Sequence, residues 1–204
     1  MPSASPAPID FYFDFSSPYG YLAAERIDGL AARYGRAVAW HPVLLGVVFK
    51  AVGTAPLPTI PVKGPYSLHD FKRSARFLGV PYVHPGRFPI ATQNAGRAFT
   101  WLARRSAALA REFALETFRA YFTADRDISD LGVVLEVAAS LGVDRDELSV
   151  AVADEGVKAR FKADVEAALA RGVFGSPFFI VDGEPFWGAD RLPQLEKWLA
   201  EGGF

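Results

Sequence analysis

Residues 9–19 read IDFYFDFSSPY, and this stretch decides the fold. Its first seven residues are mostly aromatic or apolar, which is typical of a buried β-strand. Ser16, Ser17 and Pro18 then interrupt the strand, and an apolar pattern with helical spacing follows as far as Gly35. Residues 37–45 return to a strand pattern. The beginning of the chain therefore predicts a strand–helix–strand unit with a right-handed crossover and two parallel strands.

The last thirty residues also have strand character. Residues 178–181 (FFIV) and 184–187 (EPFW) flank the pair DG at 182–183, which is a strong signal for a two-residue hairpin. A leucine repeat within residues 192–199 marks one face of a closing helix. The end of the chain therefore predicts a strand–strand–helix unit.

The middle of the chain has a different pattern. Residues 46–65 are rich in glycine and proline, which predicts a long loop, and such loops are often functional. Helical patterns dominate from there to about residue 171, with Ser129 and Asp144 expected as helix caps. Residues 1–8 are rich in proline, alanine and serine, which predicts a disordered tail.

Composition limits the classes of function. The chain has 204 residues, 50% of them hydrophobic, which suits one domain, with or without a large insertion, around a sizeable core. A net charge of −1 argues against a dedicated nucleic-acid surface. The first residues resemble no secretory signal, and no apolar run approaches the roughly 20 residues of a membrane span. We therefore expect a cytoplasmic protein without a nucleic-acid or membrane partner.

The chain contains no cysteine, and this restricts its chemistry. Disulfides, thiolate metal sites and a protein thiol nucleophile are all excluded. Any sulfur chemistry must therefore use a thiol that a small molecule brings. The three histidines are too dispersed to nominate a metal site, and none is expected.

Ser17 is the first candidate for chemistry. It lies where the first strand ends and the first helix begins, with Pro18 suited to the first helical position. Unpaired N–H groups at a helix N-terminus favour an anion and ease the ionisation of a thiol. Ser17 could donate a hydrogen bond to such a sulfur, or it could be an ordinary N-cap, which is a common role for serine.

Two further candidates lie near the C-terminus. A cis bond before Pro177 would turn the backbone groups of Ser176 toward a ligand, whereas a trans bond would simply begin the strand. Asp190 opens the last helix, where a carboxylate can bind an ammonium group or merely stabilise the helix dipole. Because the two ends of the chain should pack together, we expect these segments and Ser17 to meet.

The sequence resembles the 2-hydroxychromene-2-carboxylate isomerase family and its relatives, the kappa-class glutathione transferases, within the disulfide-oxidoreductase group of thioredoxin-like proteins. The similar segments span nearly the whole chain and are residues 10–15, 17–19, 53–63, 66, 79–81, 174–177 and 187–192. Together they are specific, although each is weak alone.

The resemblance implies an α/β, thioredoxin-like fold interrupted by a large all-helical insertion. The thioredoxin-like domain would comprise residues 9–63 and 173–204, and the helical insertion domain residues 64–172. Kappa-class relatives also imply a homodimer.

The resemblance further implies glutathione as the cofactor. Ser17 takes the place of the catalytic serine that hydrogen-bonds the glutathione sulfur. The backbone of Ser176, beside a cis Pro177, would pair with the cysteinyl part of the tripeptide.

The resemblance also implies residues for the rest of the glutathione site, with one departure from the pattern of the relatives. Ala189 and Asp190 would hold the γ-glutamyl end, and Lys63 would help to bind the tripeptide. Relatives often have Gly-Asn before the proline-rich loop, whereas this chain has Gly53-Thr54. Whether Thr54 replaces the contact of that asparagine stays open.

The implied reaction converts 2-hydroxychromene-2-carboxylate, or a similar intermediate of aromatic hydrocarbon catabolism, to open-chain trans-o-hydroxybenzylidenepyruvate. Glutathione would not be consumed. Phe49, Lys50 and Phe88 are expected to face this small aromatic substrate, although packing or solvent exposure would explain them equally well. Two alternatives stay open: a glutathione transferase or peroxidase, and a noncatalytic thioredoxin-like binding module.

Overall fold

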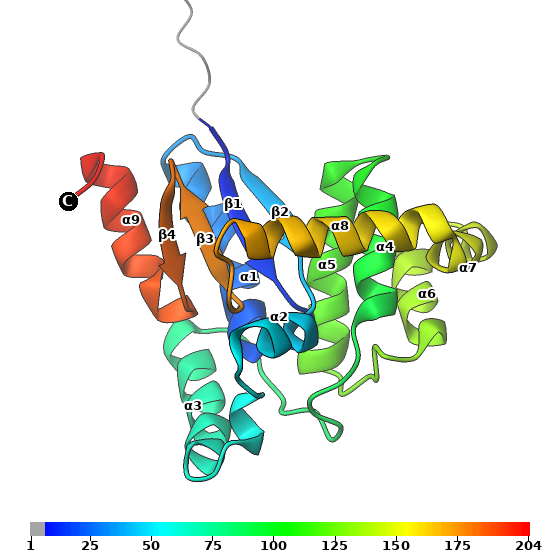
Figure 1. Ribbon diagram of the computed structural model, residues 1–204, viewed down its shortest axis with the longest axis horizontal. Coiled ribbons are helices and arrows are strands. Elements are labelled where there is room, and N and C mark those ends of the chain that lie inside the picture. Colours follow the sequence, from blue (N-terminus) through cyan, green and yellow to red (C-terminus); the bar gives the residue numbers. More distant parts are fainter. Residues whose placement is uncertain (1–6) are drawn as a thin grey trace, which may run out of the picture.

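The computed structural model describes residues 7–204. One sheet contains β1 (Ile9–Phe13), β2 (Val38–Pro42), β3 (Phe178–Val181) and β4 (Glu184–Trp187), in the order β2-β1-β3-β4 (Figure 1). β1 and β2 are parallel, and β3 is antiparallel to both β1 and β4. The strands from the two ends of the chain therefore lie side by side, as predicted.

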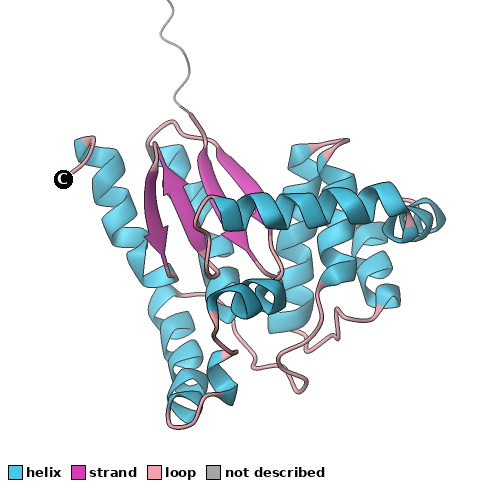
Figure 2. Ribbon diagram, viewed as in Figure 1, coloured by secondary structure: helices cyan, strands magenta, loops and turns pink. Residues whose placement is uncertain are grey.

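Helices surround this sheet. They are α1 (Pro18–Arg33), α2 (Leu45–Val52), α3 (Lys63–Leu78), α4 (Gln93–Ala103), α5 (Ala107–Phe122), α6 (Leu131–Ser140), α7 (Arg145–Ala153), α8 (Glu155–Ala170) and α9 (Leu192–Glu201), with short 3-10 helices η1 (Leu57–Thr59) and η2 (Ala189–Arg191). α4 to α7 gather beside the sheet, and α8 runs back across it (Figure 2). None of the helices that the structure describes is both long and apolar enough to cross a bilayer.

The side chains of β1 fill both faces of the sheet. Phe11 enters the main core, where its ring lies 4.9 Å from that of Trp40. Tyr12 points to the other face and joins a smaller buried cluster that includes Phe178 and Ala168 of α8. Because both faces are covered, the strand needs apolar side chains on both, and it reads as an almost continuous apolar run.

The main core also includes the helices between β2 and β3. Phe118 of α5 lies 5.6 Å from Phe13 and 5.2 Å from Phe15, measured between ring centroids. One buried cluster thus extends from the sheet into α4–α7. The predicted fold class is confirmed, and the division into domains at residues 63/64 and 172/173 stays a prediction.

The prediction of a long loop at residues 46–65 is wrong. α2 occupies most of its first half and η1 a part of its second. Gly53, at φ 71°, ends α2 in the left-handed conformation that glycine adopts at helix C-termini. The composition is therefore that of a short helix followed by a proline-rich turn.

The predicted helix caps are partly confirmed. Asp144 accepts the N–H of Glu147 at 2.8 Å and caps α7. The cap of α6 is Asp130 and not Ser129, whose hydroxyl donates to Asp127 instead. Of the predicted N-terminal tail, residues 1–6 lie outside the described residues.

Candidate active site

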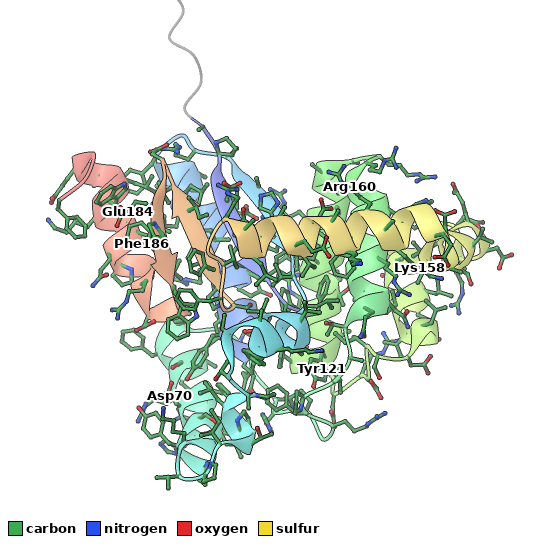
Figure 3. The ribbon with its side chains drawn as sticks, in the orientation of Figure 1. Asp70, Tyr121, Lys158, Arg160, Glu184 and Phe186 are labelled. Atoms are coloured by element: carbon green, nitrogen blue, oxygen red, sulfur yellow. The ribbon has the colours of Figure 1, made fainter. Side chains whose placement is uncertain are left out.

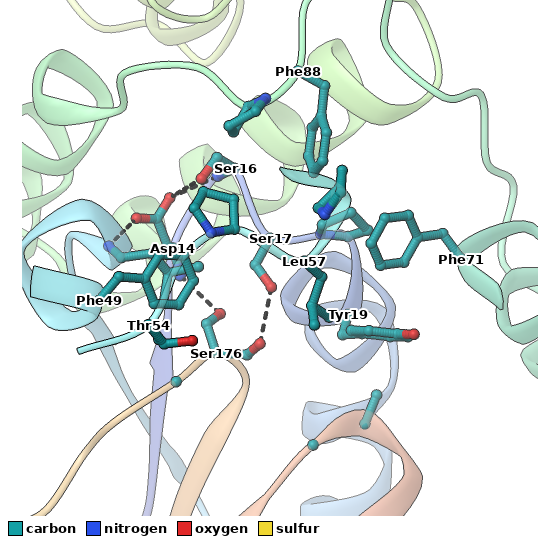
Figure 4. A pocket seen from close by; sticks show the side chains of 18 of the residues that line it. Asp14, Ser16, Ser17, Tyr19, Phe49, Thr54, Leu57, Phe71, Phe88 and Ser176 are labelled. Carbon is teal, nitrogen blue, oxygen red and sulfur yellow. Dashed lines mark hydrogen bonds between the residues drawn. The ribbon is translucent and has the colours of Figure 1, made fainter. Parts of the chain in front are cut away.

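Ser17 joins the two ends of the chain. Its side chain is buried at the N-terminus of α1, and its Oγ accepts the N–H of Gly20 at 3.0 Å, as an N-cap does. The same hydroxyl donates to the carbonyl oxygen of Ser176 at 2.9 Å (Figure 4). Ser17 is therefore an N-cap and also a contact with the loop before β3.

The loop at Ser176 has the predicted geometry. The bond between Ser176 and Pro177 is cis. Ser176 Oγ accepts the backbone N–H of Asp14 at 3.0 Å. A Cβ at residue 20 would lie 2.7 Å from that Oγ, so the close approach of α1 to this loop requires Gly20.

A cavity of about 1330 Å³ opens onto Ser17. Its polar part comes from Ser17, the loop at Ser176 and the η2 turn. Its apolar part comes from α2, η1, α3 and the loop before α4, through Phe49, Val52, Leu57, Phe71, Phe88 and Ile90 (Figure 4). Sites for one small molecule usually measure roughly 300–1,000 Å³, so this cavity is larger than a typical site for one small molecule.

Most residues that the sequence nominated line this cavity. They are Ser17, Phe49, Lys63, Phe88, Ser176, Ala189 and Asp190, and Thr54 lines it as well. Pro177 lies behind Ser176 and is not a lining residue. The structure does not place Lys50 in the cavity either: it is exposed on α2, one residue beyond Phe49, and successive side chains on a helix point in different directions.

Asp14 is a cavity-lining residue that sequence reasoning missed. Its carboxylate is buried, and Oδ1 accepts the N–H of Ser16 at 2.7 Å, its hydroxyl at 2.8 Å and that of Thr92 at 3.1 Å. Oδ2 accepts the N–H of Leu45 at 2.6 Å. Burial raises the pKa of Asp14, while these hydrogen bonds oppose the shift. The sequence signal was an acid within an aromatic strand.

Tyr19 and Asp70 form a second group that was missed. The Tyr19 hydroxyl donates to Asp70 Oδ2 at 2.5 Å, and Asp70 also pairs with Arg73. Burial and the neighbouring charge of Asp70 raise the pKa of Tyr19, so the phenol keeps its proton. This group ties α1 to α3, where Asp70 is labelled in Figure 3. It thereby fixes one wall of the cavity.

Lys63 follows a residue with an unusual backbone. Val62 has φ 69° and ψ −47°, and the N–H of Lys63 donates to the carbonyl of Pro61 at 2.8 Å. These values describe a classic γ-turn, which is rare and strained, above all for a β-branched residue. Val62 is 90% exposed, so packing does not explain the conformation.

Comparison with known proteins places the chain in a family. Residues 8–200 match the DsbA-like thioredoxin domain. The chain belongs to this family. Over 193 residues this DsbA-like protein is 31% identical to 2-hydroxychromene-2-carboxylate isomerase from Pseudomonas putida, with 93% of this chain and 92% of that protein covered. It therefore also belongs to that isomerase family, as the resemblance implied.

Two further comparisons agree with this placement. Over 206 residues the protein is 28% identical to glutathione S-transferase kappa 2 from Caenorhabditis elegans, with 95% of this chain and 92% of that protein covered. A solved structure of a 2-hydroxychromene-2-carboxylate isomerase matches with a TM-score of 0.85 at 29% identity, and 94% of each chain is covered. The prediction of an enzyme of this isomerase family is confirmed.

The side chain at the N-terminus of α1 is a hydroxyl and not a thiol. Position 17 is serine and the sequence has no cysteine, so the protein cannot itself exchange disulfides. Within residues 7–204, no three His, Asp or Glu side chains gather as a metal site would require. The described part of the site therefore offers hydrogen-bond donors and a large cavity, and the chain supplies no thiol of its own.

Proposed function

We propose that the protein is a glutathione-dependent isomerase that converts 2-hydroxychromene-2-carboxylate, or a similar intermediate of aromatic hydrocarbon catabolism, to trans-o-hydroxybenzylidenepyruvate. The observation that carries the proposal is the position of Ser17. A buried hydroxyl lies at a helix N-terminus, beside a cis-proline loop, in a cavity larger than a typical site for one small molecule. Membership of the isomerase family supports the reaction class.

The residues at the polar part of the cavity fit a thiol tripeptide. The Ser17 hydroxyl now donates to the carbonyl of Ser176. If it rotates toward a sulfur at the mouth of α1, that carbonyl becomes free to accept the N–H of a cysteinyl residue. The Ser17 proton and the N-terminus of α1 then both favour a thiolate over a thiol.

Two charged residues suit the ends of glutathione. The Asp190 side chain is 75% exposed at the cavity, where a carboxylate can bind the ammonium group of the γ-glutamyl end. Lys63 lines the same cavity and can pair with a carboxylate. The chain thus offers an acceptor and a donor of opposite charge for a zwitterionic ligand.

Glutathione, when bound, would supply the thiolate that adds reversibly to the conjugated substrate. The part of the protein is to hold that thiolate with Ser17 and to orient the aromatic ring. Phe49, Phe71 and Phe88 provide an apolar wall for the ring and reduce the access of water to it. No residue of the chain needs to act as the nucleophile.

Similarity to a kappa-class transferase supports a second candidate, in which glutathione leaves conjugated to an electrophile or oxidised. The two functions differ in what happens to the thiol. We expect 2-hydroxychromene-2-carboxylate to isomerise many times per glutathione, with total thiol unchanged. Absorbance of the product and thiol titration measure both quantities.

The outcomes of this assay separate the candidates. Loss of one thiol per molecule of product would identify a transferase. Loss of thiol that occurs only with hydroperoxides would identify a peroxidase. Absence of isomerisation with and without glutathione would overturn the proposed reaction. Homodimer formation stays a prediction, which light scattering on the purified protein tests. The cytoplasmic location also stays a prediction, and cell fractionation tests it.

A further inference from the structure

The first turn of α2 is held by a residue from β1. The N-cap position of α2 is Leu44, which is apolar and offers no side-chain acceptor. The first N–H of the helix, that of Leu45, instead donates to Asp14 Oδ2 at 2.6 Å. A carboxylate 31 residues away therefore does what an adjacent Ser or Asp usually does.

The start of α4 depends on the same carboxylate. Thr92 occupies the N-cap position of α4, and threonine there usually accepts a helix N–H. Its side chain makes no such bond, and the hydroxyl donates to Asp14 Oδ1 at 3.1 Å. Thr92 is also buried and lines the cavity. The side chain at the N-cap position of α4 thus contacts Asp14 and not the N–H groups of its own helix.

The third element that Asp14 holds is the turn that carries Ser17. Asp14 Oδ1 accepts both the N–H and the hydroxyl of Ser16. The backbone carbonyl of Asp14 accepts the N–H of Ser17 at 2.9 Å. One residue therefore contacts the turn at the serine, the helix that carries Phe49 and the start of α4.

The hydrogen-bond donors around Asp14 explain why this residue is an acid. A buried anion beside a site for a thiolate works against thiolate formation, so packing alone does not explain a carboxylate here. An ionised carboxylate can accept four hydrogen bonds, whereas an amide of the same shape can accept only on one side. The four donors around Asp14 therefore require the acid.

We propose that Asp14 is a positioning residue of the site, a role that rests on the proposed function. Its carboxylate fixes α2 and the start of α4 relative to the Ser16–Ser17 turn. The apolar wall that carries Phe49 is thereby held at a set distance from the hydroxyl of Ser17, so that the aromatic substrate and the thiolate meet in one geometry.

Asp14→Asn tests this with a change of one atom. The amide oxygen should stay with the three donors at Ser16 and Thr92, which turns the NH2 group toward the N–H of Leu45. Two donors then face each other and α2 loses its anchor. We expect KM for the aromatic substrate to rise roughly tenfold, the factor for one lost charge-assisted hydrogen bond, with the Kd of glutathione within about twofold.

Hydrogen–deuterium exchange of the ligand-free protein provides a readout that does not need activity. We expect exchange in residues 45–52 to accelerate roughly tenfold in Asp14→Asn, with residues 18–33 of α1 unchanged. Leu44→Asp, added to this variant, supplies a local cap and should slow exchange in α2 again. Asp144→Asn is the matched control, since Asp144 caps α7 away from the cavity and the variant should keep the kinetics of the native enzyme.

Several results would overturn the role of Asp14. Uniform acceleration of exchange would show a general loss of stability, and unchanged exchange in α2 would show that the anchor is not needed. Equal losses of affinity for glutathione and substrate would also contradict it. If Asp14→Asn does not fold, Thr92→Val removes a single donor and should accelerate exchange only at the start of α4. Failure of the native enzyme to isomerise the substrate refutes the proposed function alone, because the exchange experiment still decides about Asp14.

Discussion

The helix N-termini fall into two groups that differ in who satisfies their N–H groups. α5, α6, α7 and α8 each begin with a local side-chain cap, at Ser106, Asp130, Asp144 and Asp154. α2, α3, α4 and α9 begin without one. Residues at the start of each uncapped helix line the cavity, and they include Leu45, Lys63, Gln93 and Pro193.

The locally capped helices contribute to the stability of the fold, whereas the uncapped helices begin at the cavity, where a ligand can bind. A helix leaves its first N–H groups without partners, and a local cap contributes about 1 kcal/mol when it binds one of them. Around the cavity no adjacent side chain supplies that stabilisation: the N–H of Leu45 donates to Asp14 and that of Lys63 to the carbonyl of Pro61. The positive ends of these helix dipoles nevertheless lie at the cavity lining. α1 belongs to both groups, because Ser17 caps the helix and also lines the cavity.

We expect the largest loss of activity at Ser17, because α1 belongs to both groups of helices. Ser17→Ala removes the proposed donor to the glutathione sulfur, and loss of one such donor typically slows turnover by roughly 10²–10³-fold. Ser106→Ala is the matched control, since Ser106 caps α5 with the same bond, to the N–H of Leu109 at 3.2 Å. Steady-state kinetics and thermal unfolding should show both variants folded and slightly less stable, with turnover slowed only in Ser17→Ala. Full activity of Ser17→Ala would remove the serine from the mechanism.

A smaller effect is expected at η2. Asp190→Ala removes the proposed acceptor for the ammonium group of glutathione, and one charge-assisted hydrogen bond corresponds to roughly a tenfold increase in Kd. Turnover at saturating glutathione should stay within about twofold of the native value, because the lost contact is uniform binding. Calorimetric titration measures the affinity. Asp130→Ala, which removes the cap of α6, should leave it unchanged; equal weakening in both variants would mean that the loss is not local.

The turn before α3 should give a still smaller change in affinity. Val62→Gly relieves the positive φ, which costs of order 1–3 kcal/mol in other residues, but it also loosens the turn that places Lys63. We expect thermal stability to be kept or raised while the Kd of glutathione rises about threefold, or less than 1 kcal/mol. Val62→Ala keeps the restricted backbone and should bind as the native protein does. If the alanine variant is equally weak, the exposed side chain itself contacts the ligand.

The sequence predicted the elements that depend on neighbouring residues and missed those that depend on contacts between residues far apart in the chain. The strand β1, the helix after Ser17 and the hairpin at 182–183 depend on local patterns and turn chemistry, and all were predicted. α2 was missed because its first turn is held by Asp14 and not by a neighbouring cap. Thr92 was missed for the same reason, since its partner lies 78 residues away.

The candidate site was predicted mainly through the family resemblance. Position 17 has a local signal, a serine between a strand and a helix. Lys50 was placed at the cavity because the segment was taken for a loop, whereas in α2 it points elsewhere than Phe49. The direction of a side chain depends on the element that carries it, so the error in the element became an error in the site.

The difference between the two groups of helices also predicts that removing a cap away from the cavity leaves activity unchanged. Asp154 caps α8 through the N–H of Val157 at 2.9 Å and ends α7, and neither helix start lines the cavity. Asp154→Ala should lower the free energy of unfolding by about 1 kcal/mol and leave kcat/KM unchanged. Urea unfolding and steady-state kinetics on the same preparation test both parts. A fall in kcat/KM without a change in KM for either ligand would show that stability in α7 and α8 reaches the cavity, and the two groups of helices would then not be independent.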